Sequence, residues 1–327
     1  MIPSSRHQSL QDQKREEINK KMQPSVYITM PVYNGKKNLE YSLPSLRKTP
    51  YKNYKLIIAD NASTDGSAAF AKKAFPGAII LTQKINRFYG GGCNAGIRYA
   101  LSRNADYVLL LNDDVKVDPR WLTYAVKAAE SDPKIGLIEF QISNPTGRGD
   151  LKKFEEDMKN FKSLEITEVK NVTGCSMFVR ASLFKQLGLM DEGYVIYNEE
   201  TDFVKRVQKA GLKSVKINVP LYHYGEASSS KIRVKASVYS IRNIIRLSIK
   251  HATILEAIKN IGFLLKVSLT PFRKPKDLFE KRLRPFNAFV NLFILAGAFF
   301  WNLAELPQTL MIRRKENKRI RQFRLVH

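Results

Sequence analysis

The sequence is poor in cysteine, and its first residues contain no apolar run. Its two cysteines, Cys93 and Cys175, are too few for a disulfide framework or, on their own, for a thiolate zinc site. We expect both to be small, buried packing residues. Residues 1–23 are polar and charged, without an apolar stretch of signal-peptide length. We therefore expect a surface tail there and a reduced, cytosolic environment for the protein.

Acidic side chains are scarce as well. The chain has 30 Asp and Glu against 55 Lys and Arg, which gives a formal net charge of +25. Residues 231–327 alone contain 21 Lys and Arg against 5 Asp and Glu. This asymmetry favours an anionic partner: nucleic acid, acidic lipid or a phosphorylated substrate. We expect no nucleic acid, because the sequence contains no recognisable nucleic-acid module and its basic residues are not interleaved with aromatic ones.

Hydrophobic residues make up 44% of the chain, enough for a globular core, and they alternate between strand-like and helix-like segments. This order predicts βαβ units in an α/β fold, with a Rossmann-like, mostly parallel sheet flanked by helices. Residues 144–164 are polar and predict a surface excursion. The predicted strands are 25–30, 55–59, 78–81, 107–111, 135–140, 172–179 and 215–221. The predicted helices are 39–47, 67–74, 93–102, 121–129, 181–187 and 201–210.

Polar clusters follow three of the predicted strands: residues 31–34, 60–65 and 112–114. Ligands of open α/β sheets bind beyond the carboxyl ends of the strands, so these clusters are the first candidates for a site. Asp113 and Asp114 would place two carboxylates at the exit of a buried strand, where they repel each other unless a cation lies between them. Mg²⁺ or Mn²⁺ would suit such oxygen ligands and could bridge them to a diphosphate. Capping of the next turn, at Asp118, explains the pair equally well.

Residues 86–96 form a glycine-rich segment, which we expect to be a loop that opens a helix at Cys93. Glycines let the backbone approach a phosphate or sugar closely, and a helix N-terminus favours anions. The segment is not a P-loop, because no Gly-Lys-Ser/Thr follows, and it lacks the dinucleotide-binding pattern. Alone, it does not identify a ligand.

A series of motifs in fixed order adds specificity. The chain resembles glycosyltransferase family 2, near its rhamnosyl- and galactofuranosyltransferase-like members, from about Pro24 to Leu247. The motifs that carry this resemblance are Pro31-Val-Tyr-Asn34, Ala59-Asp-Asn-Ala-Ser-Thr-Asp-Gly-Ser67, the glycine-rich segment from Gly90 to Ile97, Leu111-Asn-Asp-Asp-Val115, Thr173-Gly-Cys-Ser-Met-Phe-Val-Arg180, Tyr197-Asn-Glu-Glu-Thr-Asp202 and His223-Tyr-Gly-Glu-Ala-Ser228.

The resemblance implies a GT-A fold and an inverting, single-displacement transfer of a sugar. It implies that Asp114 and His223 hold a divalent cation, Mg²⁺ or Mn²⁺, and that Glu200 is the catalytic base, with Glu199 as the alternative. Asp60 would accept a hydrogen bond from N3–H of the nucleotide base. The full set implied to bind the nucleotide-sugar is Pro31, Val32, Tyr33, Asn34, Asp60, Asn61, Ser63, Asn86, Gly91, Gly92, Asn94, Asp113 and Arg242.

The sequence departs from the family pattern at three places. Asn112 stands where the DXD-type motif begins with Asp, Glu199-Glu200 stands where Glu-Asp is frequent, and Phe88 replaces a common glycine. The departures at Asn112 and Glu200 keep an alternative open: a catalytically inactive relative that acts as a membrane-associated scaffold. Turnover of a nucleotide-sugar would separate the two.

The last third of the chain predicts basic helices. Residues 253–269 have apolar side chains at helical spacing with Lys259 and Lys266 among them, and residues 286–306 are richly apolar but are interrupted by three Asn and Glu305. We expect helices that lie at a membrane surface with basic residues near anionic headgroups. A buried helix or an oligomer contact is the alternative.

The expected organisation has three parts: a tail at 1–23, a nucleotide-sugar-binding catalytic domain at 24–228, and a basic, partly amphipathic helical region at 229–327. The expected partners are a nucleotide-sugar donor, UDP- or dTDP-linked by preference, a glycan or lipid-linked acceptor, and an anionic membrane surface. The expected location is cytoplasmic and peripheral, at the inner face of the cell membrane, in cell-surface polysaccharide synthesis.

Overall fold

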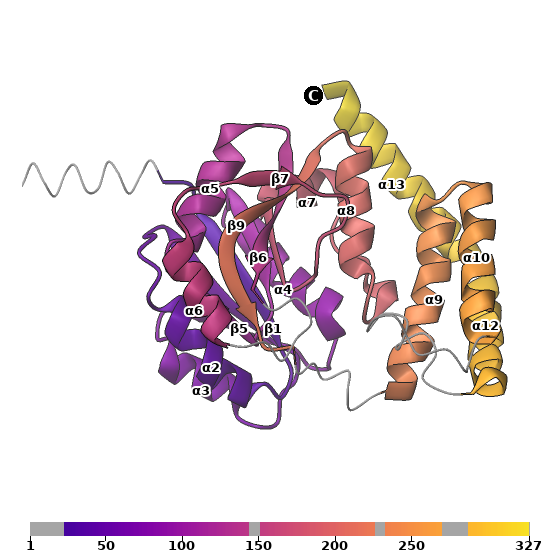
Figure 1. Ribbon diagram of the computed structural model, residues 1–327, viewed down its shortest axis with the longest axis horizontal. Helices are drawn as coiled ribbons and strands as arrows, with labels where there is room; N and C mark the ends of the chain where they lie inside the picture. Colours follow the sequence, from indigo (N-terminus) through magenta and orange to yellow (C-terminus); the bar gives the residue numbers. More distant parts are fainter. Residues whose placement is uncertain (1–22, 144–150, 226–232, 270–286, 327) are drawn as a thin grey trace, which may run out of the picture.

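The computed structural model describes residues 23–143, 151–225, 233–269 and 287–326. In these residues one nine-stranded sheet forms the centre of the molecule, in the order β3-β2-β1-β4-β8-β6-β9-β5, with β7 paired to β9 (Figure 1). Six strands run in the same direction, and β5, β7 and β8 run against them. The strands are β1 Val26–Val32, β2 Tyr54–Asp60, β3 Ile79–Thr82, β4 Tyr107–Leu111, β5 Val115–Val117, β6 Ile135–Ile142, β7 Ile166–Glu168, β8 Ser176–Arg180 and β9 Lys213–His223.

Helices cover both faces of this sheet, which explains why its central strands are apolar throughout. All five residues of β4 are buried. One core cluster joins the face of β1 that carries Ile28 to α2 and α5, and a second joins the face of β4 that carries Leu110 to α4, α7 and α8. The helices concerned are α2 Lys36–Leu46, α3 Ser67–Ala74, α4 Phe88–Ser102, α5 Trp121–Ser131, α6 Leu151–Asn160, α7 Ala181–Leu187 and α8 Glu199–Lys209, with a 3₁₀ turn η1 at Glu192–Tyr194.

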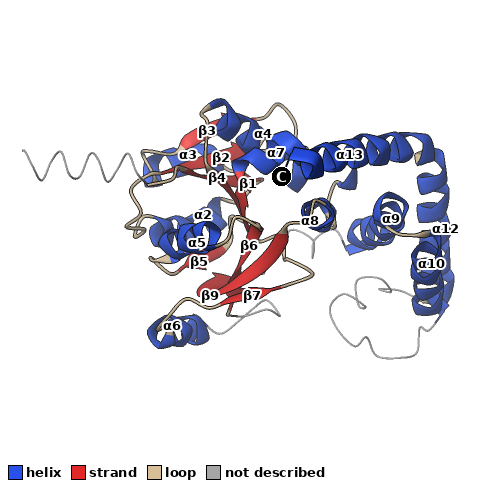
Figure 2. Cartoon of the chain, turned by 90° about the horizontal axis from the view of Figure 1, so that it is seen from above, coloured by secondary structure: helices blue, strands red, loops and turns tan. Residues whose placement is uncertain are grey.

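Four further helices form the C-terminal region: α9 Arg233–His251, α10 Ile254–Leu269, α12 Ala288–Ala304 and α13 Leu306–Val326. Helices α10 and α12 lie on the side of α9 that faces away from the sheet (Figures 1 and 2). Helix α13 turns back toward the sheet, where Ile320 and Phe323 enter the core cluster of α4 and α7. Helix α13 therefore belongs to the same packing unit as the sheet and the helices on this face of it.

Among the described helices, none is by itself long and apolar enough to cross a membrane. Helices α12 and α13 pass the length and hydropathy test only together, and they are bent by 63° at their junction.

Two predictions from the sequence are wrong in detail. The glycine-rich segment is not a loop, because α4 begins at Phe88 and its glycines lie in the first turns of the helix. A Cβ at Gly92 would lie 2.7 Å from both the Pro31 Cβ and the Asn61 Nδ2, so the glycines allow α4 to approach the strand ends closely. The predicted polar excursion contains α6 at residues 151–160, which buries Phe154; its residues 144–150 lie outside the described part. The short strands β5 and β7 were not predicted.

Candidate active site

Asp114 and His223 meet at the carboxyl end of β4. Asp114 lies between β4 and β5, directly before Val115, and His223 ends β9, whose register pairs His223 with Val115 of β5. The His223 Nε2 lies 3.2 Å from the Asp114 Oδ1 and 3.2 Å from the Asn112 Nδ2. The other oxygen, Asp114 Oδ2, accepts a hydrogen bond from the Gly225 backbone N–H at 3.2 Å. Residues 109 positions apart in the chain are thus brought together at one sheet edge.

The donor set fits a divalent cation. Asp114 is only 6% exposed, and its buried Oδ1 makes no hydrogen bond; the His223 Nε2 at 3.2 Å is an ion-pair partner of this oxygen only when the imidazole is protonated. A buried, unpartnered carboxylate oxygen is costly unless an ion or a proton compensates it. Adjacent ligands of an octahedral Mg²⁺ or Mn²⁺ ion, at metal–oxygen distances of about 2.1 Å, lie about 3 Å apart. The spacing of the imidazole nitrogen and this oxygen matches that requirement.

Asp113 lies beside this pair. Burial, followed by the charge of Asp114, raises the pKa of Asp113 to about 7, although the Asn38 amide donates a hydrogen bond to its Oδ1 at 3.1 Å. A Cβ at Gly35 would collide with the Asp113 Oδ2, so this glycine leaves room for the carboxylate. Two carboxylates that oppose each other's ionisation favour a bound cation.

The predicted nucleotide-binding residues line the ends of β1 and β2. Val32 and Asp60 are register partners in the parallel pair, and both are buried. The Asp60 Oδ1 accepts from the Ser63 N–H at 3.3 Å, and the Ser63 Oγ accepts from the Asn34 N–H at 2.9 Å. Pro31 lies against Gly92 of α4, and Tyr33 is 48% exposed at the rim.

Asn61 connects this pocket to α4. Its Nδ2 donates to the Phe88 carbonyl at 3.0 Å, and its Oδ1 is buried without a hydrogen-bond partner. The Asn86 Oδ1 caps the same turn by accepting from the Phe88 N–H at 2.8 Å. A buried acceptor next to Asp60 suits a polar ligand that brings its own donor.

Glu199 and Glu200 begin α8. Glu199 is 4% exposed, and its Oε2 has no hydrogen-bond partner. Burial, and then the charge of Glu200, raises the pKa of Glu199 well above its usual value. Glu200 is half-buried and packs along Gly174, where an added Cβ would lie 3.4 Å from the Glu200 Cγ. The two acids therefore differ in environment: one is enclosed, and the other reaches solvent.

The segment before β8 connects the two acidic groups. The Asn112 N–H donates to the Cys175 carbonyl at 2.9 Å, next to Gly174, which packs on Glu200. The Tyr89 hydroxyl donates to the Gly174 carbonyl. The charge of Asp114 contributes to the raised pKa of Cys175, and Glu199 and Glu200 contribute to that of Tyr89; burial is the largest cause for both. The DXD-type end of β4 and the acidic start of α8 thus border the same region.

Comparisons with known proteins agree with this site. The family model described as Glycosyl transferase family 2 matches residues 27–188. The chain is 28% identical over 224 residues to an N-acetylglucosaminyl-diphospho-decaprenol L-rhamnosyltransferase of Mycobacterium tuberculosis, covering 59% of this chain and 72% of that protein. The chain belongs to glycosyltransferase family 2.

Other glycosyltransferases are similar over a longer range. The glycosyltransferase AglE of Haloferax volcanii is 23% identical over 257 residues, covering 74% of this chain and 82% of that protein. The solved mannosyltransferase PcManGT of Pyrobaculum calidifontis, in complex with GDP-Man and Mn²⁺, superimposes with a TM-score of 0.56 at 15% identity. The match covers 94% of this chain and 88% of the PcManGT chain, and it includes the C-terminal helices. The fold is therefore GT-A.

Asn94 and Arg242, two residues predicted to bind the donor of this family 2 enzyme, make hydrogen bonds within the protein. The Asn94 Nδ2 donates to the Met190 carbonyl and to the Glu192 Oε1, both at 2.9 Å, and its Oδ1 accepts from the Met190 N–H. Arg242 lies between the Tyr239 and Trp301 rings and donates to the Gly193 and Tyr194 carbonyls at 2.8 and 2.6 Å. Both side chains thus hold the segment that leads into α8, and a direct contact with the donor stays a prediction for each.

Sequence reasoning missed Asn243, which is fully buried next to Arg242. Its Nδ2 donates to the carbonyls of Tyr194, Ile196 and Tyr197 at 2.8, 2.7 and 2.8 Å. Three residues of this segment, Val195, Tyr197 and Asn198, have φ between 67° and 71°. A left-handed backbone is unfavourable for such side chains, so the loop needs external support. The Arg242-Asn243 pair, in the middle of α9, was the available signal.

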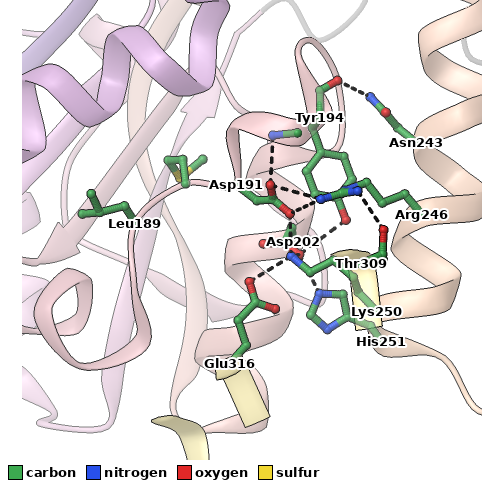
Figure 3. Close-up of polar contacts among 12 residues, drawn as sticks. Leu189, Asp191, Tyr194, Asp202, Asn243, Arg246, Lys250, His251, Thr309 and Glu316 are labelled. Atoms are coloured by element: carbon green, nitrogen blue, oxygen red, sulfur yellow. Dashed lines mark hydrogen bonds and ion pairs between the residues drawn. The ribbon is translucent and has the colours of Figure 1, made fainter. Parts of the chain in front are cut away.

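A buried ionic cluster, also missed, fixes the same loop to α9 and α13 (Figure 3). The Lys250 Nζ lies 2.9 Å from Asp191 Oδ2, 2.6 Å from Asp202 Oδ1 and 2.9 Å from Glu316 Oε1. Arg206 and Arg246 complete it, paired with Asp202 and Asp191. Apart from Asp202 and Arg206, which are four residues apart on α8, these pairs join residues far apart in the chain and leave no periodic signal.

The acidic groups of this cluster do not form a metal site. Asp202, His251 and Glu316 come close enough to share an ion. The Lys250 ammonium, however, lies within 3 Å of both carboxylates and supplies the positive charge that a metal ion would bring. Desolvation works to raise the pKa of Asp202, but Arg206, His251 and Lys250 outweigh it, and the pKa is lowered.

A pocket of about 380 Å³ lies at the opposite, amino-terminal edge of the strands, among residues that include Pro24, Tyr107 and Arg180. Arg180 is already engaged there, with the Tyr107 hydroxyl at 3.0 Å. This pocket shares no residue with the carboxylate site.

Proposed function

We propose that this family 2 glycosyltransferase is an inverting, metal-dependent enzyme that moves a sugar from a nucleoside diphosphate to a hydroxyl of a glycan or lipid-linked acceptor. One observation carries the proposal: the Asp114–His223 pair and the Glu199–Glu200 pair border the same edge of the sheet, with Cys175 and Gly174 between them. A cation site and a base are what transfer from a diphosphate donor requires.

The residues divide the work as follows. Asp114 and His223 would hold Mg²⁺ or Mn²⁺, which when bound stabilises the charge that develops on the departing diphosphate. A carboxylate of α8 takes the proton from the acceptor hydroxyl as that oxygen attacks the anomeric carbon; such general-base help contributes roughly 10²–10⁴-fold. Attack from the side opposite the leaving group inverts the anomeric configuration.

Glu200 is the better base of the two acids. Its neighbour Glu199 is enclosed and has a raised pKa, so Glu199 favours the protonated form and is poorly suited to accept another proton. Glu200 is half-buried and packs beside Gly174, facing the region of the metal pair.

The donor we propose is a UDP- or dTDP-sugar. Asp60 is buried at the end of β2, where its carboxylate could accept from N3–H, a group that uracil and thymine share. Incubation with UDP-, dTDP- and GDP-sugars, with release of the nucleoside diphosphate as the readout, tests this choice. Turnover of GDP-sugars alone would contradict it.

We propose the inner face of the cell membrane as the place of action and a lipid-linked glycan precursor as the acceptor. Two observations support this: the excess of basic residues in the last third of the chain, and the similarity to a rhamnosyltransferase whose name includes a diphospho-decaprenol.

Substitution Glu200→Gln tests the catalytic assignment. The amide keeps the size of the side chain but cannot take the proton, so we expect kcat to fall at least about 100-fold while donor binding is retained. Glu305→Gln, at a half-buried acid between α12 and α13, is the control. Near-normal turnover by Glu200→Gln would refute the base assignment. If the unchanged protein turned over no nucleotide-sugar at all, the scaffold alternative would hold instead.

A further inference from the structure

The outer sides of α10 and α12 carry large, exposed apolar side chains. We call this surface the α10–α12 face and define it by Ile254, Ile258, Leu265, Phe289, Phe293 and Phe300. Ile254 is 84% exposed, Phe289 80% and Phe293 76%. Both helices lie at the end of the molecule away from the sheet in both views (Figures 1 and 2).

The spacing places these residues on one side of each helix. They recur at positions i, i+4 and i+11 in both helices, which is one face at 3.6 residues per turn. The inner sides are apolar too: Leu264 and Leu295 pack with Ile241 and Ile245 of α9 in a separate cluster. The described part of the fold packs the inner sides and leaves the outer ones exposed.

Exposure of this much apolar surface indicates a partner. Monomeric soluble proteins seldom expose contiguous apolar patches beyond a few hundred Å². Removing one Phe or Leu side chain from water gains about 1.5–3 kcal/mol. Three phenylalanines and three aliphatic side chains on neighbouring helices represent a strong drive toward an apolar phase.

The charges around the α10–α12 face point to an anionic lipid surface. Helix α12 contains no charged residue. Helix α10 adds Lys259 and Lys266, both exposed, and its single acid, Glu256, accepts from the Thr253 N–H at 2.8 Å. Apolar side chains that enter the acyl boundary, with lysines at headgroup level, are typical of helices that lie in a membrane interface.

Charge also argues against a second copy of the chain as the occupant. Residues 231–327 have a strong excess of Lys and Arg, so two such regions face to face would bring like charges together. An anionic bilayer instead attracts basic residues, at about 1 kcal/mol for each Lys or Arg near its surface.

We propose that the α10–α12 face lies in the interfacial layer of an anionic lipid bilayer, with α10 and α12 parallel to its plane. The inference rests on the proposed function only in its choice of membrane, because a lipid-linked acceptor would be held in the same bilayer. Association itself requires neither donor nor acceptor.

Co-sedimentation with vesicles tests the proposal on the full chain. We expect binding to vesicles of phosphatidylcholine and phosphatidylglycerol in equal amounts, and weaker binding to phosphatidylcholine alone. The double substitution Phe289→Ser with Phe293→Ser should weaken binding to the anionic vesicles at least about tenfold, since two large apolar side chains are lost. Raising the salt from about 0.1 M to about 1 M should weaken binding but leave an apolar part.

A matched control exists in the chain. Leu325 and Val326 are 85% and 79% exposed and lie at the end of α13, next to Phe323 of the catalytic core cluster. Substitution of both by Ser removes apolar area of similar exposure, and we expect vesicle binding to stay unchanged.

Three results would overturn the proposal: no binding to anionic vesicles, equal losses in the two double variants, or a dimer in solution that dissociates on Phe289→Ser with Phe293→Ser. The last result would make the face a contact between copies. Release of nucleoside diphosphate in the absence of vesicles tests the proposed function separately, so failure of one leaves the other standing.

Discussion

At the scale of residues, Asp114 and His223 carry the strongest chemical argument. They stand 109 positions apart in the chain and meet at 3.2 Å, and the Asp114 oxygen that faces the imidazole makes no hydrogen bond. Such an arrangement is unfavourable in an empty, ion-free state, because nearby carboxylates such as Asp113 repel the same charge. We therefore expect loss of a single charge at this pair to weaken cation binding.

We expect Asp114→Asn to weaken Mn²⁺ binding at least about tenfold, because a neutral amide replaces the anionic ligand. Titration of the donor-free protein with Mn²⁺, followed by electron paramagnetic resonance, measures this directly. Asp118→Asn is the matched control: Asp118 is as buried, but Arg120 pairs with it at 2.6 Å. Equal Mn²⁺ affinity in the two variants would mean that Asp114 is not a ligand.

The sequence predicted the residues of this site better than their surroundings. Asp60, Asp114, Glu200 and His223 each stand at the end of a strand or the start of a helix, positions that local pattern and motif order reveal. The roles of Asn94 and Arg242 as supports of a loop were not predictable, because their partners are backbone carbonyls about 50 or more positions away.

At the scale of elements, side chains of α9 hold the loop 191–198 in place by hydrogen bonds. Asn243 alone satisfies three of the loop carbonyls, and Arg242 binds two. The loop ends at Glu199 and Glu200, so its conformation sets where the acidic pair lies. Helix starts were predictable only within a few residues: α4 begins five residues earlier than Cys93 because glycines tolerate the close approach to β1 and β2.

Asn243→Ala should separate positioning from binding. Without its amide, the loop loses the bonds that hold its left-handed residues, and we expect kcat to fall about 10–100-fold while the donor KM stays nearly constant. Steady-state kinetics provides both values. Asn291→Ala, at an equally buried amide on α12, is the control for general destabilisation. If both variants lose kcat alike, the effect is not specific to the loop.

At the scale of the whole molecule, one buried ionic cluster joins the catalytic domain to the C-terminal region. Lys250 of α9 contacts acids from the loop, from α8 and from α13. Burial tends to raise the pKa of Asp191, but Lys250 and Arg246 outweigh it and hold that pKa below its usual value. Asp191 therefore adds stability above the ordinary carboxyl pKa near 4, and this contribution is lost as the pH falls through its lower folded value.

We expect Lys250→Met to lower the free energy of unfolding by about 3–5 kcal/mol at pH 8, because three buried carboxyl groups lose a shared cation. Their folded pKa values should then rise, and that of Glu316 is above its usual value even with Lys250 present. The folded state would bind more protons, so the deficit should shrink as the pH is lowered from about 8 to about 5. Urea unfolding at several pH values measures this trend.

Lys213→Met is the comparison, since Lys213 makes an ion pair of equal length with Asp132 at the exposed surface. It should cost under about 1 kcal/mol with little pH dependence. A Lys250→Met variant that behaved in the same way would show that the cluster adds no stability.

Helix α13 has a consequence for how the protein is made. Its residues Ile320 and Phe323 complete a core whose other members are strands and helices synthesised long before. Until the ribosome has released this segment, Arg206 and Lys250 lack their partner Glu316, and a hydrophobic seam beside α7 stays open. We therefore expect the nascent chain to acquire its native core only after translation has passed α13.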